Sequence, residues 1–176
     1  MLDILEATTL IRVQSWAIPA APPPVEKELG VSWPMSVGAV ACGKVELLCL
    51  GPTEWLLESD QPGEAARLMD VLGRGFHGTS FRATDLSAGL VQIQVSGPHA
   101  RLLLSKGTGV DLHPNSFAPG QCVRTRFAGM PVVIRCVDAD VFRCMVTASH
   151  QQYLWDWLAD AAVEFEVAPT TKLTVP

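Results

Sequence analysis

The sequence has little charge, no excess of basic residues and no long apolar run. Only 18% of its 176 residues are charged, against about 25% in an average soluble domain. Thirteen Lys and Arg oppose 18 Asp and Glu, which gives a net charge of -5, whereas nucleic-acid-binding proteins carry a basic face. No run approaches the ~18 apolar residues that span a bilayer. We therefore expect neither a nucleic-acid partner nor a membrane span, and the scarcity of charge favours a subunit over a free monomer.

We also expect no secretory signal, and the cysteine spacing is not that of a metal or disulfide protein. Asp3 and Glu6 stand where a signal peptide would carry Lys or Arg, so we expect a cytoplasmic protein. The five cysteines form an odd number with no C-x-x-C pair and no close Cys/His cluster. We expect reduced, mostly buried thiols that act as small apolar side chains.

Apolar residues make up 48% of the sequence, enough for one ordinary core. Residues 1–43 keep no helical or strand period and contain several prolines, which predicts an extended, Pro-rich arm. We expect a single α+β domain over 44–167, with halves at 44–117 and 118–167. The last residues, 168–176, form a tail without a period.

Within that domain, period-2 alternation predicts strands and period-3.6 stripes predict helices. The expected strands are 44–49, 55–57, 90–95, 122–127, 131–137 and 141–147. The expected helices are 61–72, the segment between Pro98 and Gly107, and the segment from Ser149 to Phe165. Short turns cannot carry parallel crossovers, so the order predicts antiparallel sheets with helices on one face, an α+β fold.

Aromatic and arginine side chains are the candidate anchors of a protein interface. Trp16 and Trp33 lie in the predicted arm, where they either pack on the chain's own body or enter a partner's groove. Trp55, Arg124 and Arg126 complete the interface candidates. Arg124 and Arg126 also belong, with two further arginines, to an alternating set on neighbouring predicted strands. That set is either an anion or carboxylate site, or a wet face or subunit contact.

Residues 135 and 143 are the other two arginines of this set. The sequence contains no G-x-S-x-G elbow, and its four histidines are scattered without i, i+4 partners. Asp138 and Asp140 flank a predicted turn. Such a turn is exposed to solvent, so we do not expect the two carboxylates to act as a catalytic acid and base. We therefore expect no catalytic residue and no metal ligand in this chain.

Several short motifs resemble known families. The segments TDLS (84–87) and VQIQVSGPHA (91–100) resemble the folate-binding aminomethyltransferases, in which a D-[VL]-S turn precedes a strand and a G-P-x-A helix start. A closer resemblance is to the gamma subunit of heterotetrameric sarcosine oxidase. It rests on LGPTEWLL (50–57), DLS (85–87), SGPHAR (96–101), DLHP (111–114) and YLWDWL (153–158), which occur in the expected order.

The resemblance implies part of an aminomethyltransferase fold with two ferredoxin-like halves. It implies a hetero-oligomer in which this chain has a structural, non-catalytic role beside alpha, beta and delta subunits, chiefly alpha. Those subunits would hold FAD, FMN, NAD and tetrahydrofolate, with no cofactor in this chain. The complex would demethylate sarcosine to glycine and pass the one-carbon unit to folate.

One departure bears on chemistry. Full aminomethyltransferases carry a G-G-x-x-D-D type turn whose aspartate sits by the folate amine, but the matching segment here, 127–134, has no carboxylate. Pro or Val cannot exchange charge with a reacting amine, so independent folate catalysis is not expected. Asp85 is the one folate candidate.

Two other functions stay open. One is a stand-alone folate-binding protein or aminomethyltransferase, with a pocket from Asp85, the loop 108–120 and the basic strands. The other is a gamma-like subunit of a related N-methyl amino-acid dehydrogenase. The subunit hypothesis predicts a partner interface larger than ~1,000 Å².

Overall fold

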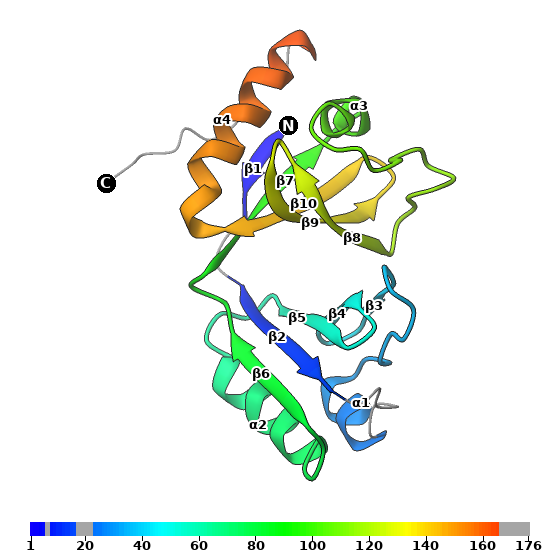
Figure 1. Cartoon of the computed structure of the whole chain (residues 1–176), viewed down its shortest axis with the longest axis vertical. Coiled ribbons are helices and arrows are strands. Elements are labelled where there is room, and N and C mark those ends of the chain that lie inside the picture. The colour runs from blue at the N-terminus through cyan, green and yellow to red at the C-terminus, as the bar shows by residue number, and fades with distance from the viewer. Residues whose placement is uncertain (6–7, 17–22, 166–176) are drawn as a thin grey trace. The chain divides into compact units, whose positions relative to one another are not determined.

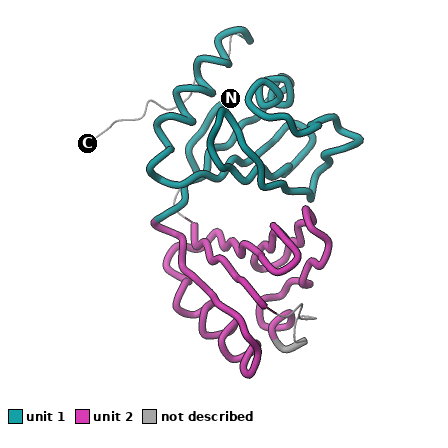
Figure 2. The backbone as a smooth tube through the Cα atoms, viewed as in Figure 1, with its two compact units in different colours: residues 1–6, 89–176 teal, residues 7–88 magenta. Residues whose placement is uncertain are grey.

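The structure is a computed structural model that describes residues 1–5, 8–16 and 23–165. Its contacts divide the chain into two compact units (Figures 1 and 2). Unit 1 comprises Met1–Glu6 and Gly89–Pro176, and unit 2 comprises Ala7–Ala88. Each unit contains one five-stranded antiparallel sheet.

Unit 1 has the strand order β1-β7-β10-β9-β8. These strands are β1 (Leu2–Ile4), β7 (Leu90–Ser96), β8 (Gln121–Phe127), β9 (Met130–Asp138) and β10 (Val141–Thr147). Its helices are α3 (Ala100–Ser105) and α4 (Gln151–Ala162), and single 3₁₀ turns, η1 (Ala148–His150) and η2 (Val163–Phe165), flank α4. The first strand therefore pairs with a strand some ninety residues later in the sequence.

One face of this sheet forms the core of unit 1. Strand residues alternate between faces, so Ile93 and Val95 of β7 point to the same side as Phe142 and Cys144 of β10. The two helices cover that side with their apolar stripes, which consist of Ala100, Leu103, Leu104, Leu154, Trp155, Leu158 and Ala162. Helices on one face of an antiparallel sheet are the arrangement expected from the sequence.

Unit 2 has the strand order β3-β4-β5-β2-β6. Its strands are β2 (Thr9–Ser15), β3 (Val40–Cys42), β4 (Glu46–Gly51), β5 (Glu54–Ser59) and β6 (Phe81–Asp85). Its helices are α1 (Pro23–Leu29) and α2 (Ala65–Gly75). Both helices contribute to its core, since Val25 and Leu29 of α1 join Leu68 and Leu72 of α2 against the sheet.

The predicted arm over 1–43 differs from the structure. Residues Thr9–Ser15 form β2, which lies inside the sheet of unit 2 between β5 and β6. The prolines at 23 and 24 begin α1 instead of preventing a helix, because the first turn of a helix needs no amide from them. The contact pattern also places the unit boundaries near 6 and 88, away from the expected halves at 44–117 and 118–167.

The prediction that the cysteines are mostly buried is confirmed. Four are buried, Cys42 is exposed, and none of the five forms a disulfide. Burial raises the pKa of Cys144 to about 12, and it also raises the pKa values of Cys49 and Cys136. Among the helices that the structure describes, none is long and apolar enough to cross a membrane.

Candidate functional site

Asp85 ends β6 and organises the turn that follows. Its Oδ1 accepts hydrogen bonds from the backbone N of Ser87 at 2.9 Å and from the Ser87 hydroxyl at 2.6 Å. These two bonds hold the pKa of Asp85 below its ordinary value. The Ser87 hydroxyl oxygen in turn accepts from the backbone N of Leu10 at 3.0 Å. The D-L-S motif thus fixes a turn against β2. Asp85, the one folate candidate, therefore has a structural role in this turn.

Trp33 and Trp55 lie together inside unit 2. They are 6% and 1% exposed, and their ring centroids are 5.4 Å apart. The indole N–H of Trp55 donates to the Pro34 carbonyl at 2.7 Å, and Trp33 also meets Phe76 edge-on at 5.3 Å. Trp33 therefore packs on the chain's own body, the first of its two alternatives, and the interface candidate Trp55 is buried beside it.

Trp16 differs from the other two tryptophan candidates. It follows β2 directly and is 71% exposed, and its backbone N donates to the Ser80 carbonyl at 3.0 Å. Its side chain is therefore accessible, as an interface anchor requires. The interface role itself stays a prediction.

The four arginines of the alternating set share one face of the unit 1 sheet. Arg143 pairs directly with Arg135 across β10 and β9, and Arg124 and Arg126 follow on β8 at alternate positions. This is the face opposite α3 and α4. Arg126 is exposed and donates from Nη2 to the Gly129 carbonyl at 3.1 Å. Arg124 is exposed, and Arg135 is only 4% exposed.

The hairpin between β8 and β9 is a tight turn without a carboxylate. Phe127 pairs with Met130, and Ala128 and Gly129 between them have φ values of 48° and 87°. Two consecutive positive φ values are the mark of a tight two-residue turn. No carboxylate stands in 127–134, so these residues do not fit the recognition of a folate amine.

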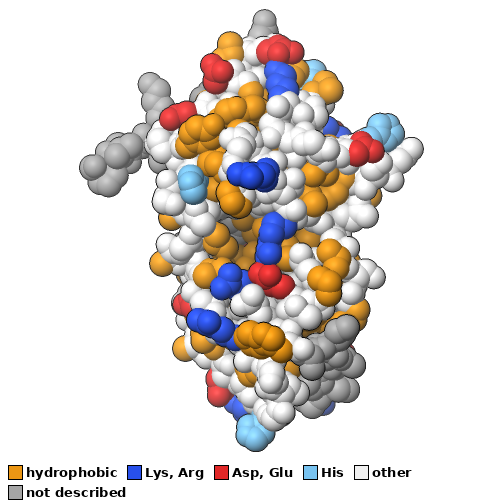
Figure 3. Space-filling view, in the orientation of Figure 1, with side chains coloured by type: hydrophobic (Ala, Val, Ile, Leu, Met, Phe, Trp, Pro, Cys, Tyr) orange, Lys and Arg blue, Asp and Glu red, His pale blue; other side chains and the backbone are white. Residues whose placement is uncertain are grey.

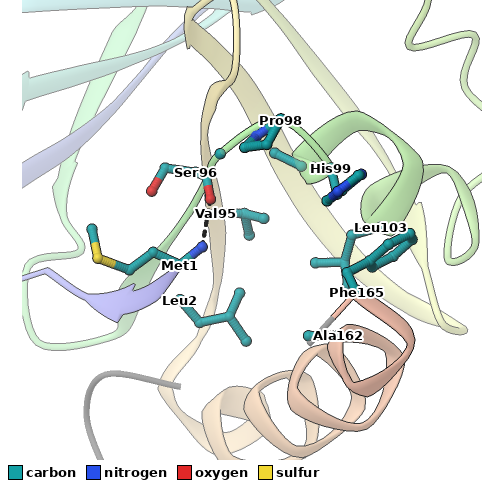
Figure 4. A pocket seen from close by; sticks show the side chains of 11 residues that line it. Met1, Leu2, Val95, Ser96, Pro98, His99, Leu103, Ala162 and Phe165 are labelled. Carbon is teal, nitrogen blue, oxygen red and sulfur yellow. Dashed lines mark hydrogen bonds between the residues drawn. The ribbon is translucent and has the colours of Figure 1, made fainter. Parts of the chain in front are cut away.

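Unit 1 contains an apolar pocket between its sheet and the ends of its helices (Figure 4). The pocket has a volume of about 230 Å³. Leu2 and Val95 come from the sheet, Leu103 from α3, and Phe165 from η2. His99 stacks on Phe165 with centroids 4.9 Å apart, and the Met1 amine donates to the Ser96 carbonyl. The lining is mostly apolar, and the His99 ring and the Met1 amine are polar groups in it.

Within residues 1–5, 8–16 and 23–165, no three His, Cys, Asp or Glu side chains lie together as metal ligands would. Asp138 and Asp140 are exposed, as expected for a solvated turn.

Residues 14–164, most of the chain, match the sarcosine oxidase, gamma subunit family. This chain belongs to that family. The sarcosine oxidase subunit gamma of Corynebacterium sp. (strain U-96) is 35% identical over 142 residues, which cover 79% of this chain and 67% of that protein. The subunit gamma of an Arthrobacter species is 34% identical and covers 81% and 69%.

Solved structures extend the family assignment to the fold. A chain of the heterotetrameric sarcosine oxidase from Corynebacterium sp. U-96, in complex with pyrrole 2-carboxylate, is 30% identical with a TM-score of 0.84. The match covers 97% of this gamma-family chain and 87% of the other. Aminomethyltransferase T of the Bartonella henselae glycine cleavage system aligns with a TM-score of 0.60 at 18% identity, over 89% of this chain and 44% of that one. The expected aminomethyltransferase-like fold is confirmed.

Sequence reasoning missed the pocket of unit 1. Its lining comes from three distant segments, Met1–Leu2, residues 95–103 and residues 162–165. The one sequence signal for it was the S-G-P-H-A-R motif, which supplies the central segment of the lining.

Proposed function

We propose that this chain is the non-catalytic gamma-type subunit of a heterotetrameric sarcosine oxidase. In this proposal it assembles with alpha, beta and delta subunits, chiefly alpha, in the cytoplasm. The complex demethylates sarcosine oxidatively to glycine with folate as the one-carbon acceptor. FAD, FMN, NAD and tetrahydrofolate are held by the other subunits.

One observation carries the proposal: the match to a heterotetrameric sarcosine oxidase chain extends over 97% of this chain and 87% of that one. A likeness confined to one unit would indicate only a shared module. Because it includes both units and nearly all of the other chain, it supports the same role in the same kind of assembly.

The chain's own residues support a role in assembly rather than in chemistry. The Oδ1 atom of the folate candidate Asp85 accepts two hydrogen bonds from Ser87 in the turn that follows β6. The hairpin at Ala128 and Gly129 offers no carboxylate to a reacting amine. Flavin and nicotinamide groups would supply the redox chemistry, and this chain would supply a surface that holds the larger subunits.

The decisive experiment captures the tagged chain from its native cells. We expect three partner chains by mass spectrometry, flavin absorption in the visible spectrum, and bleaching of that absorption when sarcosine is added without oxygen. A colourless solitary chain contradicts the proposal. Bleaching by another N-methyl amino acid, but not by sarcosine, favours the dehydrogenase alternative.

Calorimetry with tetrahydrofolate tests the stand-alone folate protein. We expect no heat of binding to the isolated chain, with the captured complex as the positive control. Saturable binding to the isolated chain contradicts a purely structural role.

A further inference from the structure

Strand β6 forms one edge of the unit 2 sheet. It lies at the end of the strand order, and β2 is its one partner among the described strands (Figure 1). Just beyond its two ends, the Ser80 carbonyl accepts from the Trp16 amide, and the Leu86 amide donates to the Leu10 carbonyl. Hydrogen-bonded pairs alternate with non-bonded pairs along an antiparallel ladder. The even-numbered residues of β6 therefore bond to β2, and the backbone groups of the odd-numbered residues point away from it.

The outward-pointing backbone groups belong to Phe81, Ala83 and Asp85. In the part of the chain that the structure describes, nothing bonds to these N–H and C=O groups. The strand is also accessible, because Phe81 and Ala83 are half-buried and Arg82 and Asp85 are exposed. An accessible edge of this kind is a template for another extended chain.

The two faces at this edge differ in chemistry. Phe81 and Ala83 pack against the core of unit 2, and the Phe81 ring stacks on Phe76 with centroids 5.2 Å apart. Successive residues of a strand alternate between faces, so Arg82 and Thr84 point to the opposite face. A strand added to β6 would place every second side chain beside the two apolar residues and the others beside Arg82 and Thr84.

Charge on that opposite face specifies the occupant. Arg82 lies opposite Gln14 of β2, and Arg12 lies opposite Thr84, so two guanidinium groups share this face close to the edge. No carboxylate of residues 1–5, 8–16 or 23–165 forms an ion pair with either arginine. The Nε of Arg12 is buried without a hydrogen-bond partner among those residues. An Asp or Glu on the added strand would complement these charges.

Trp16 adds an apolar side chain to the same face. It directly follows β2 and is 71% exposed, whereas the preceding Ser15 is buried. Alternation along β2 therefore places Trp16 on the face of Arg12, at the Ser80 end of β6. Figure 3 shows both apolar and basic side chains at the surface of unit 2 on the face in view. An exposed tryptophan beside an open edge is a typical anchor of an interface.

A second copy of this chain is a poorer occupant of the edge. Two copies related by a two-fold axis would pair β6 antiparallel with itself. Pairing centred on Arg82 brings like charges opposite each other. Pairing centred on Ala83 or Thr84 places the Asp85 carboxylate beside an apolar side chain of the other copy. Each arrangement costs free energy, which favours a different chain.

We propose that β6 is extended by a strand of another subunit of the complex, which carries an Asp or Glu opposite Arg82 and apolar side chains beside Phe81 and Ala83. Trp16 contacts the same segment at the Ser80 end of β6. This inference rests on the proposed function and adds to it the surface of this chain and the chemistry of the partner segment.

The first test blocks the edge without breaking the sheet. Proline removes the outward amide of Ala83, and edge strands tolerate it where the N–H faces away from the neighbouring strand. We expect Ala83→Pro to stay folded by thermal unfolding but to bind the other subunits about tenfold or more weakly in titrations. Ala83→Val keeps the amide and is the matched control, which should bind like the wild type. Wild-type binding by Ala83→Pro overturns the inference.

A charge test uses Arg82. We expect Arg82→Glu to weaken binding several-fold at low salt, with a smaller effect at high salt because salt screens exposed charges. The matched control is Lys44→Glu, since Lys44 is exposed between β3 and β4 at the opposite edge of the same sheet. It should bind like the wild type. Unchanged or tighter binding by Arg82→Glu at low salt contradicts an acidic partner segment.

Amide hydrogen exchange reads the edge directly and needs no variant. We expect exchange at Phe81, Ala83 and Asp85 to slow by about tenfold or more when the complex forms. Arg82 and Thr84 are internal controls because their amides already face β2. Fast exchange at the three outward amides in both states overturns the inference. Protection that rises with the concentration of the isolated chain assigns the edge to a second copy and also overturns it.

The failure of this inference is distinguishable from that of the proposed function. If the wild-type chain captures no flavin-bearing subunits, the proposed function fails. If it captures them but the β6 amides and the edge variants show no effect, only this inference fails.

Discussion

The two units share one layer arrangement but fill it differently. Unit 2 packs a connected set of aromatic rings beneath its sheet, in which Trp33 contacts Trp55 and Phe76, and Phe76 stacks on Phe81 at 5.2 Å. Unit 1 leaves a pocket of about 230 Å³ at the ends of its helices. Large aromatic side chains dominate core energetics, so we expect the stability of unit 2 to depend strongly on these rings, whereas the pocket of unit 1 is space that no described side chain fills.

The largest test of this comparison removes the centre of the aromatic set. Trp55→Ala deletes a fully buried ring and leaves the Pro34 carbonyl without its donor, so we expect the free energy of unfolding to fall by about 3–5 kcal/mol. Urea denaturation measures it. Trp16→Ala is the matched control at an exposed site and should change stability by less than about 0.5 kcal/mol. Similar losses for the two variants would contradict the structure.

Unit 1 has ring pairs of its own, Phe117 with Phe142 and Phe127 with Trp157, and it adds a polar clamp around Arg101. The Arg101 guanidinium donates to the carbonyls of Leu112 at 2.6 Å, Phe117 at 2.8 Å and Ala139 at 3.0 Å, and it lies over the Phe142 ring. Arg101→Met leaves those carbonyls unsatisfied, and we expect a loss of about 2–4 kcal/mol in chemical denaturation.

The conservative variant Arg101→Lys sharpens this prediction. Lys keeps the charge but lacks the planar guanidinium with which Arg donates to several carbonyls at once. We therefore expect Arg101→Lys to recover less than half of the stability that Arg101→Met loses. Full recovery would show that charge alone matters.

A pair of glycines in α2 tests the packing of unit 2 on a smaller scale. A Cβ at Gly75 would lie 1.8 Å from Cγ2 of Val25, whereas a Cβ at Gly73 meets nothing within 4 Å. We expect Gly75→Ala to cost about 1–3 kcal/mol and Gly73→Ala to add up to about 1 kcal/mol. Thermal unfolding measures both, and a stabilising Gly75→Ala would refute the close approach of α1.

The smallest expected effect concerns pH. Asp85 has a lowered pKa because the Ser87 hydroxyl and amide bond its ionised form. Its contribution to stability is therefore present above the unfolded pKa of about 3.9 and disappears as pH falls through the folded value. We expect Asp85→Asn to be less stable than the wild type at neutral pH and equal to it near pH 2. A stability difference that grows toward low pH would contradict this assignment.

Local patterns explain which parts of the fold were predictable. Strands β7 and β10 were expected because apolar and polar side chains alternate along them. Strand β2 was missed although Ile11 and Val13 alternate with Arg12 and Gln14, because this alternation spans only a few residues and the three residues before Arg12 are buried consecutively. Strand β1 has three residues and depends on a partner ninety positions away, which no local pattern contains.

In the candidate site, too, features set by local residue types were predictable and features set by distant segments were not. The D-L-S and G-P-H-A motifs located turns that the structure contains, since turn geometry depends on local residue types. The sequence did not predict which of Trp16, Trp33 and Trp55 would be buried, because burial depends on which distant segments cover each side chain. The pocket of unit 1 was invisible for the same reason.

The pairing of β1 with β7 also has a consequence for the order of folding. Unit 2 is one continuous stretch, whereas unit 1 takes residues from both sides of it. During synthesis, Leu2 must wait for Val95 to emerge before their strands can pair. Closing that long loop costs entropy that falls if the intervening stretch is already compact. Synthesis thus favours an early unit 2, whose completion brings the two ends of unit 1 within reach of each other.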